Sequence, residues 1–152
     1  VVRTAESPIN DVESAKLLLG ETADLHDAES VRTPADALAR VAQCRVVVTG
    51  AYHNAVFALS MGIPVVGLAR GDYYTSKMRG VADMFGVGMT VLDYADADLA
   101  AKLRDATLHA WSQADVVAAP LQAKVREQIG RAREAYDLFF NHVSASMRRS
   151  TR

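Results

Sequence analysis

Two short segments contain most of the side chains in this sequence that could take part in catalysis or ligand binding. The first covers residues 49–54 and includes Thr49, Gly50, His53 and Asn54. Gly50 would let a ligand approach the backbone closely, and the unpaired N–H groups of a first helical turn attract anions. A bound anion would favour the charged imidazolium of His53, which suits that residue to anion binding or proton donation. The alternative is a histidine at a helix start that makes only a local hydrogen bond.

The second segment, residues 70–77, follows the next apolar run of the sequence. It carries two cations, two aromatic side chains and two hydroxyls, and its candidate ligand-binding residues are Arg70, Tyr74 and Lys77. Two cations near a helix N-terminus can hold a phosphate or a carboxylate between them. The alternative is that Arg70 and Lys77 are ordinary solvated charges, and spacing alone leaves both interpretations open.

Several other kinds of site lack support in the sequence. The histidines share no metal-ligand spacing and join no carboxylate-rich motif, so no metal site is predicted. No glycine-rich dinucleotide fingerprint, Walker lysine motif or Gly-x-Ser-x-Gly elbow is present. The single cysteine, Cys44, excludes an intrachain disulfide. Because Cys44 comes just before an apolar run, we expect it to be a buried, inert thiol.

The length and net charge of the chain exclude further classes of protein. The chain has 152 residues, half of them hydrophobic, and a formal net charge of −1. A chain without a basic excess is not expected to bind nucleic acid generally. No apolar run reaches the roughly 18–20 residues that cross a bilayer, and the first residues do not form a signal peptide. We therefore expect a cytoplasmic protein without a transmembrane segment. Because Val1-Val2-Arg3 resembles the end of a strand, we also expect a domain of a longer protein.

Short apolar runs alternate with helical patterns as far as residue 94. The runs predict strands at 1–3, 23–26, 45–49, 64–69 and 89–92. The β-branched run 45–49 and the apolar run 64–69 are typical of strands buried on both faces. Helical patterns fall at 11–19, 33–42, 52–61 and 73–85, and Thr33, Pro34 and Asp36 form a typical helix start. This order predicts an α/β fold, namely one Rossmann-like domain over 1–152 with a parallel sheet of about five strands.

Residues 95–152 are predicted to be entirely helical. One amphipathic stretch falls at 99–110 and a longer one at 121–143, and we expect the apolar stripe of the longer one to pack against the sheet or a neighbouring domain. In an open parallel sheet, ligands bind beyond the carboxyl ends of the strands. Segments 49–54 and 70–77 each follow a predicted strand, so we expect the site at that edge.

The run from Val46 to Leu68 resembles the signature region of the polysaccharide pyruvyl transferase family, and residues 72–86 continue the similarity. A strand, His53, the sequence Gly62-Ile63-Pro64 and a Tyr74-x-x-Lys77 segment occur in the family's order. The similarity is strong over residues 44–93.

The resemblance implies the C-terminal, donor-binding half of an architecture like the two-domain GT-B glycosyltransferases, with an N-terminal domain missing from this chain. It further implies transfer of a pyruvyl group from phosphoenolpyruvate to two hydroxyls of a saccharide or lipid-linked saccharide acceptor, in exopolysaccharide or cell-wall biosynthesis. The products would be a ketal and phosphate, with no cofactor. In that scheme His53 binds the donor or acts as the acid. The other donor-binding candidates are Thr49, Gly50, Asn54, Arg70, Tyr74 and Lys77.

Ala51 is a departure from the family pattern, because the family usually has an arginine two positions before the motif histidine. That arginine would contribute a charge-assisted contact to the donor. Either another cation replaces it, with Arg70 and Lys77 the nearest in sequence, or this copy is catalytically weak or has been altered. Two other functions stay open. The same architecture also fits a GT-B-type glycosyltransferase or sugar-nucleotide epimerase domain, and Ala51 together with the missing half fits a non-catalytic binding domain.

Overall fold

The computed structural model describes residue 31 and residues 33–150, with side chains to residue 144. The chain divides into two compact units, 1–43 and 44–152. In the first unit the described helix is α2 (Pro34–Val41). Its start is a capping box: Asp36 N donates to Thr33 Oγ1 (3.2 Å) and Thr33 N donates to Asp36 Oδ2 (2.8 Å). This confirms the predicted helix start. The predicted elements at 1–3, 11–19 and 23–26 lie outside the described residues.

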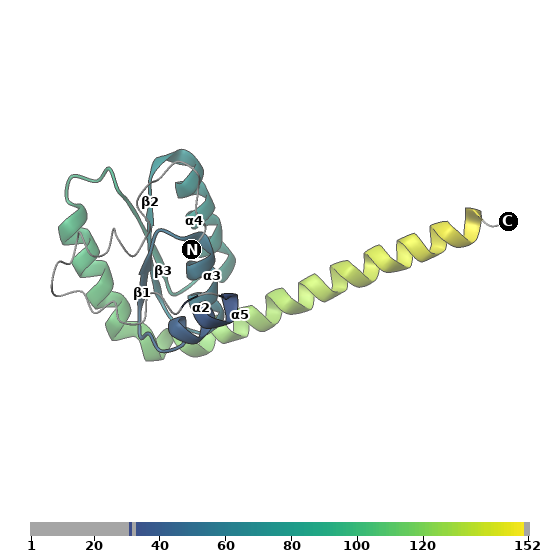
Figure 1. Cartoon of the computed structure of the whole chain (residues 1–152), viewed down its shortest axis with the longest axis horizontal. Helices are drawn as coiled ribbons and strands as arrows, with labels where there is room; N and C mark the ends of the chain where they lie inside the picture. The colour runs from purple at the N-terminus through teal and green to yellow at the C-terminus, as the bar shows by residue number, and fades with distance from the viewer. Residues whose placement is uncertain (1–30, 32, 151–152) are drawn as a thin grey trace. The chain divides into compact units, whose positions relative to one another are not determined.

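The second unit is built on a small parallel sheet. Its described strands are β1 (Val47–Thr49), β2 (Val65–Ala69) and β3 (Met89–Asp93), in the spatial order β1-β2-β3 (Figure 1). Both pairs are parallel, because each strand is joined to the next by a helix that returns the chain to the same end. The α/β class and three of the five predicted strands are confirmed.

The two runs 45–49 and 64–69 differ in how far the sheet's neighbours cover them. β2 lies between the other two strands and is almost wholly buried, as predicted. β1 has three residues, and Val48 is 44% exposed, so the prediction that this run is buried on both faces is wrong. The physical reason is that β-branched residues favour extended backbone, whereas coverage depends on neighbours, and β1 lies at an edge of the described sheet.

Helices α3 (Tyr52–Ser60) and α4 (Gly71–Phe85) connect the strands and lie together on one face of the sheet (Figure 1). Their apolar sides supply much of the core: Ala55, Ala58 and Leu59 from α3, and Met78, Val81 and Phe85 from α4. α4 ends where Gly86 adopts φ +73° and donates its N–H to Ala82 O at 2.8 Å, a left-handed cap that favours glycine. α4 starts two residues before the predicted position, so residues 71–72 form part of its first turn.

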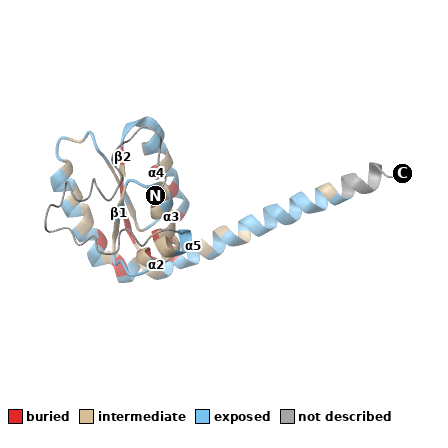
Figure 2. Ribbon diagram, viewed as in Figure 1, coloured by how far each residue is buried: buried red, intermediate tan, exposed pale blue. Residues whose placement is uncertain are grey.

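The segment after β3 forms one long helix, α5 (Leu99–Ser150), with Pro120 inside it. Ala110, Ala114 and Leu121 are buried, and of these Leu121 belongs to the stripe that is predicted to pack. From residue 131 to 142 every residue is exposed (Figure 2), including Tyr136 and Phe139. Beyond its first part, the stripe over 121–143 is therefore not packed against the sheet, so that expectation is wrong there; packing against a neighbouring domain stays a prediction. Within the described residues, no helix combines the length and apolar character needed to cross a membrane.

Candidate functional site

The carboxyl ends of the three described strands meet at one edge of the sheet. Thr49 pairs with Gly67 near the end of β2, and Ala69 pairs with Asp93 at the end of β3. The chain leaves this edge through residues 50–51, residue 70 and residues 94–98. The two segments singled out from the sequence therefore lie at the same edge, as expected for a parallel sheet.

The first segment leaves the start of α3 without a side-chain cap. Ala51 is the N-cap residue, with φ −89° and ψ 119°, and an alanine offers no oxygen to the first-turn N–H groups. Thr49 Oγ1 instead accepts a hydrogen bond from Ala51 N at 3.0 Å, which holds the turn between β1 and α3. N–H groups of an uncapped first turn carry partial positive charge and can receive an anion.

Gly50 is exposed and its backbone does not by itself require glycine. A Cβ added there would meet Leu68 O at 3.5 Å and Tyr94 Oη at 3.9 Å, which are ordinary contacts. These distances also place the hydroxyl of Tyr94, the residue that follows β3, beside the first segment. Tyr94 was not among the residues predicted from the sequence.

His53 lies in the first turn of α3 and is exposed, and Asn54 beside it is half-buried. The His53 ring stands edge-on to the Tyr52 ring, with centroids 5.5 Å apart, and lies 6.5 Å from the Phe57 ring. The imidazole is thus held against aromatic side chains of its own helix while it stays open to solvent, an arrangement that suits ligand binding.

The candidate residues of the second segment differ in whether they contact the first segment. Arg70 is the N-cap residue of α4, is exposed, and makes no side-chain cap. Tyr74 is exposed, and its ring stands edge-on to that of Tyr73 at 5.2 Å. Among the described residues, no hydrogen bond or ion pair links Arg70 or Tyr74 to the first segment.

Lys77 is the residue that joins the two segments. It lies in the second turn of α4, and its Nζ sits 4.6 Å from the centre of the Tyr52 ring on α3 and 5.8 Å from the Tyr73 ring. These are cation–π distances. Lys77 and His53 therefore both contact the ring of Tyr52. The i, i+4 spacing of Tyr73 and Lys77 could have identified one ring from the sequence, whereas no local signal points to Tyr52.

Cys44, which we expected to be buried, is exposed, so that prediction is wrong. The run at 45–49 that suggested burial follows Cys44 directly, but the strand β1 begins only at Val47. In the part of the chain that the structure describes, no group of three or more His, Cys, Asp or Glu side chains is placed to hold a metal ion.

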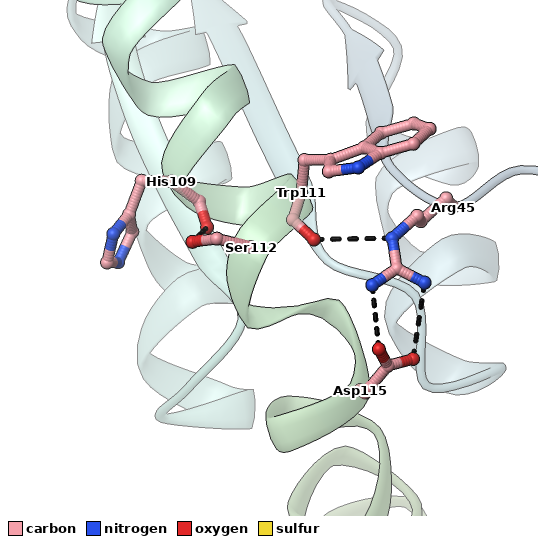
Figure 3. A network of polar contacts seen from close by, with 5 residues as sticks. All are labelled: Arg45, His109, Trp111, Ser112 and Asp115. Atoms are coloured by element: carbon pink, nitrogen blue, oxygen red, sulfur yellow. Dashed lines mark hydrogen bonds and ion pairs between the residues drawn. The ribbon is translucent and has the colours of Figure 1, made fainter.

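A separate polar network lies at the amino end of β1, away from the candidate site. Arg45 donates to both carboxylate oxygens of Asp115 (3.2 and 2.7 Å) and to the backbone oxygen of Trp111 (3.3 Å), and its guanidinium lies 5.4 Å from the Trp111 ring (Figure 3). The hydrogen bond and the positive charge of Arg45 lower the pKa of Asp115, and the same hydrogen bond raises the pKa of Arg45. The network ties the start of β1 to α5, which is a structural role.

Comparison with known proteins finds a family model that matches part of the chain. Residues 7–73 match the family model described as polysaccharide pyruvyl transferase, which confirms the resemblance predicted from the sequence. The match includes the 49–54 segment and Arg70 and ends before Tyr74 and Lys77. Over residues 74–93 the similarity stays a prediction. Searches of curated proteins and of solved structures find no match.

Proposed function

We propose that this chain is the donor-binding half of a polysaccharide pyruvyl transferase and that its donor is phosphoenolpyruvate. The observation that carries the proposal is the family match over residues 7–73, because it covers the 49–54 segment at the carboxyl edge of the sheet. His53, the best candidate for chemistry in that segment, is exposed there. Parallel sheets of this kind bind their ligands at that edge.

Phosphoenolpyruvate carries a carboxylate and a phosphate, so its site needs positive groups on more than one side. The uncapped start of α3 offers backbone N–H donors, His53 lies in the same turn, and the ammonium of Lys77 approaches from α4. Arg70 stands at the start of α4, also without a side-chain cap. These groups supply positive charge from two helices and complement a dianionic or trianionic donor.

In the proposed reaction, His53 delivers a proton to the methylene carbon of the donor, which leaves C2 electrophilic. A sugar hydroxyl oxygen then forms a bond to C2 and loses its proton. A second hydroxyl of the same sugar bonds to C2 as the C2–O bond to phosphate breaks, and its proton passes to the departing phosphate. The products are a pyruvate ketal and inorganic phosphate. The acceptor is held by a second domain in this proposal, so we expect the 152-residue chain alone to bind the donor without turnover.

The test is a calorimetric titration of phosphoenolpyruvate into the 152-residue chain and two variants, His53→Ala and His109→Ala. His109 is an exposed histidine on α5, which makes it a matched control. We expect weak binding that decreases as salt is added, because charged groups dominate the site. Binding should weaken further in His53→Ala and stay unchanged in His109→Ala.

Two results would overturn the proposal. One is binding that is tight, insensitive to salt and unaffected by His53→Ala, since the anion site would then lie elsewhere. The other is binding of a sugar nucleotide with no response to phosphoenolpyruvate, which would favour the glycosyltransferase or epimerase alternative.

A further inference from the structure

The lysines with described side chains differ in what surrounds their ammonium groups. Lys102 pairs with Asp96 at 2.6 Å, and Lys124 pairs with Glu127 at 2.8 Å. Lys77 is half-buried and has no ion pair within the described residues; its ammonium lies over the rings of Tyr52 and Tyr73. A carboxylate partner neutralises an ammonium, whereas an aromatic ring attracts it and leaves its full charge available.

The two rings come from different helices, and this fixes where the charge lies. Tyr73 precedes Lys77 by one turn of α4, so the two side chains share a helix face. Tyr52 is the first residue of α3 and stands next to Ala51, where the first-turn N–H groups have no side-chain cap. The shorter of the two distances, 4.6 Å, is the one to Tyr52. The ammonium of Lys77 is therefore drawn across the gap between the helices towards the start of α3.

Tyr52 also contacts the other candidate group of the site. Its ring meets the His53 ring edge-on at 5.5 Å, so one aromatic side chain touches both the imidazole and the ammonium. From this geometry we infer that Tyr52 is a positioning residue. It holds Lys77 beside the start of α3, where Lys77 supplies the positive charge that Ala51 lacks. This inference rests on the proposed function, because it takes the ligand to be the anionic donor.

The first test needs no ligand. In an NMR spectrum of the 152-residue chain, the ε-methylene protons of Lys77 should be shifted upfield by the ring currents of the tyrosines, relative to those of Lys102 and Lys124. Tyr52→Leu should remove most of this shift, and Tyr52→Phe should keep it, because phenylalanine retains the ring. An unshifted Lys77 signal in the wild type would overturn the inference.

The second test is a double-mutant cycle on phosphoenolpyruvate affinity. Tyr52→Leu and Lys77→Met should each weaken binding by about three- to tenfold, and Tyr52→Phe should bind like the wild type. In the Lys77→Met background, Tyr52→Leu should have no further effect, because Tyr52 acts through the ammonium. Lys77→Met should also reduce the salt dependence of binding. The control is Tyr136→Leu, which removes an exposed tyrosine from α5. Thermal unfolding of every variant checks that it is folded.

The possible failures can be told apart. If the wild type does not bind phosphoenolpyruvate, the proposed function and this inference fall together. If the wild type binds it and Lys77→Met weakens binding, but Tyr52→Leu binds like the wild type, only the positioning role of Tyr52 is wrong. Additive effects of Tyr52→Leu and Lys77→Met would also overturn that role, because the two side chains would then act independently.

Discussion

Gly88 lies so close to Leu121 that a Cβ added at residue 88 would come within 2.8 Å of Leu121 Cδ1. Gly88 also has φ +77°, a conformation that side-chain-bearing residues rarely adopt. Leu121 is completely buried in α5, and Gly88 precedes β3. This contact joins α5 to the sheet at the amino end of the strands.

We expect Gly88→Ala to lower the free energy of unfolding by about 1–3 kcal/mol, because it combines backbone strain with a clash against a buried side chain. Gly80→Ala is the matched control. Gly80 lies inside α4, and a Cβ there would meet nothing within 4 Å, so this change should stabilise the protein by about 1 kcal/mol. Urea denaturation of both variants measures the difference. Equal stability of the two would contradict the close packing of Gly88 on Leu121.

The contact between Gly88 and Leu121 also gives a prediction for the residue on α5. Leu121→Ala should destabilise the protein by about 2–5 kcal/mol, since it removes a fully buried side chain and leaves a cavity against the sheet. Leu108→Ala, on the same helix at a side chain that is 62% exposed, should change stability little. If denaturant midpoints fall equally in both variants, α5 does not pack on the sheet through Leu121.

The parts of the fold that sequence predicts well are those decided by local chemistry. The capping residues Thr33 and Asp36 and the apolar run of β2 act through their own backbone or immediate neighbours, and the structure has them as expected. The stripe at Tyr136 and Phe139 has helical spacing, and the segment is helical, but spacing does not determine whether another element covers that face. Both side chains are exposed.

The same distinction applies to the candidate site. The topology of parallel strands brings residues 49–54 and 70–77 to one edge, and this could be inferred from their order along the chain. The neighbour relationship between Tyr52 and Lys77 could not, because the two residues lie 25 positions apart on different helices. Only the packing of α3 against α4 brings them together.

The ion pair between Arg45 and Asp115 makes stability depend on pH in the acid range. The pKa of Asp115 is lowered in the folded protein from its ordinary value of 3.8, mainly by the hydrogen bond from Arg45. A carboxylate whose pKa is lowered on folding stabilises the folded state at pH values above its unfolded pKa. That contribution is lost as the pH falls below 3.8 through the folded pKa.

We therefore expect Asp115→Asn to lower the melting temperature slightly at pH 7 and progressively less as the pH falls below 3.8. The effect is small because the Asp115 side chain is 82% exposed and the pair is screened by solvent. Asp83→Asn is the control, since Asp83 is exposed on α4 and has no ion pair among the described residues. A difference between the wild type and Asp115→Asn that persists at pH 2 would mean that the charge of Asp115 is not its source.

At the uncapped start of α3, a change at Ala51 that stabilises the helix is expected to weaken anion binding. Ala51 has the extended backbone of an N-cap but no side-chain oxygen. Ala51→Asp should cap the helix and raise the free energy of unfolding by about 0.5–2 kcal/mol. It should also weaken phosphoenolpyruvate binding, because it places a negative charge where the donor's anionic group is proposed to lie.

Ala51→Arg should strengthen that binding without the gain in stability. Denaturation and titration of the two variants side by side measure both effects. If Ala51→Asp stabilises the protein yet leaves donor affinity unchanged, the start of α3 is a structural helix terminus and the donor binds elsewhere.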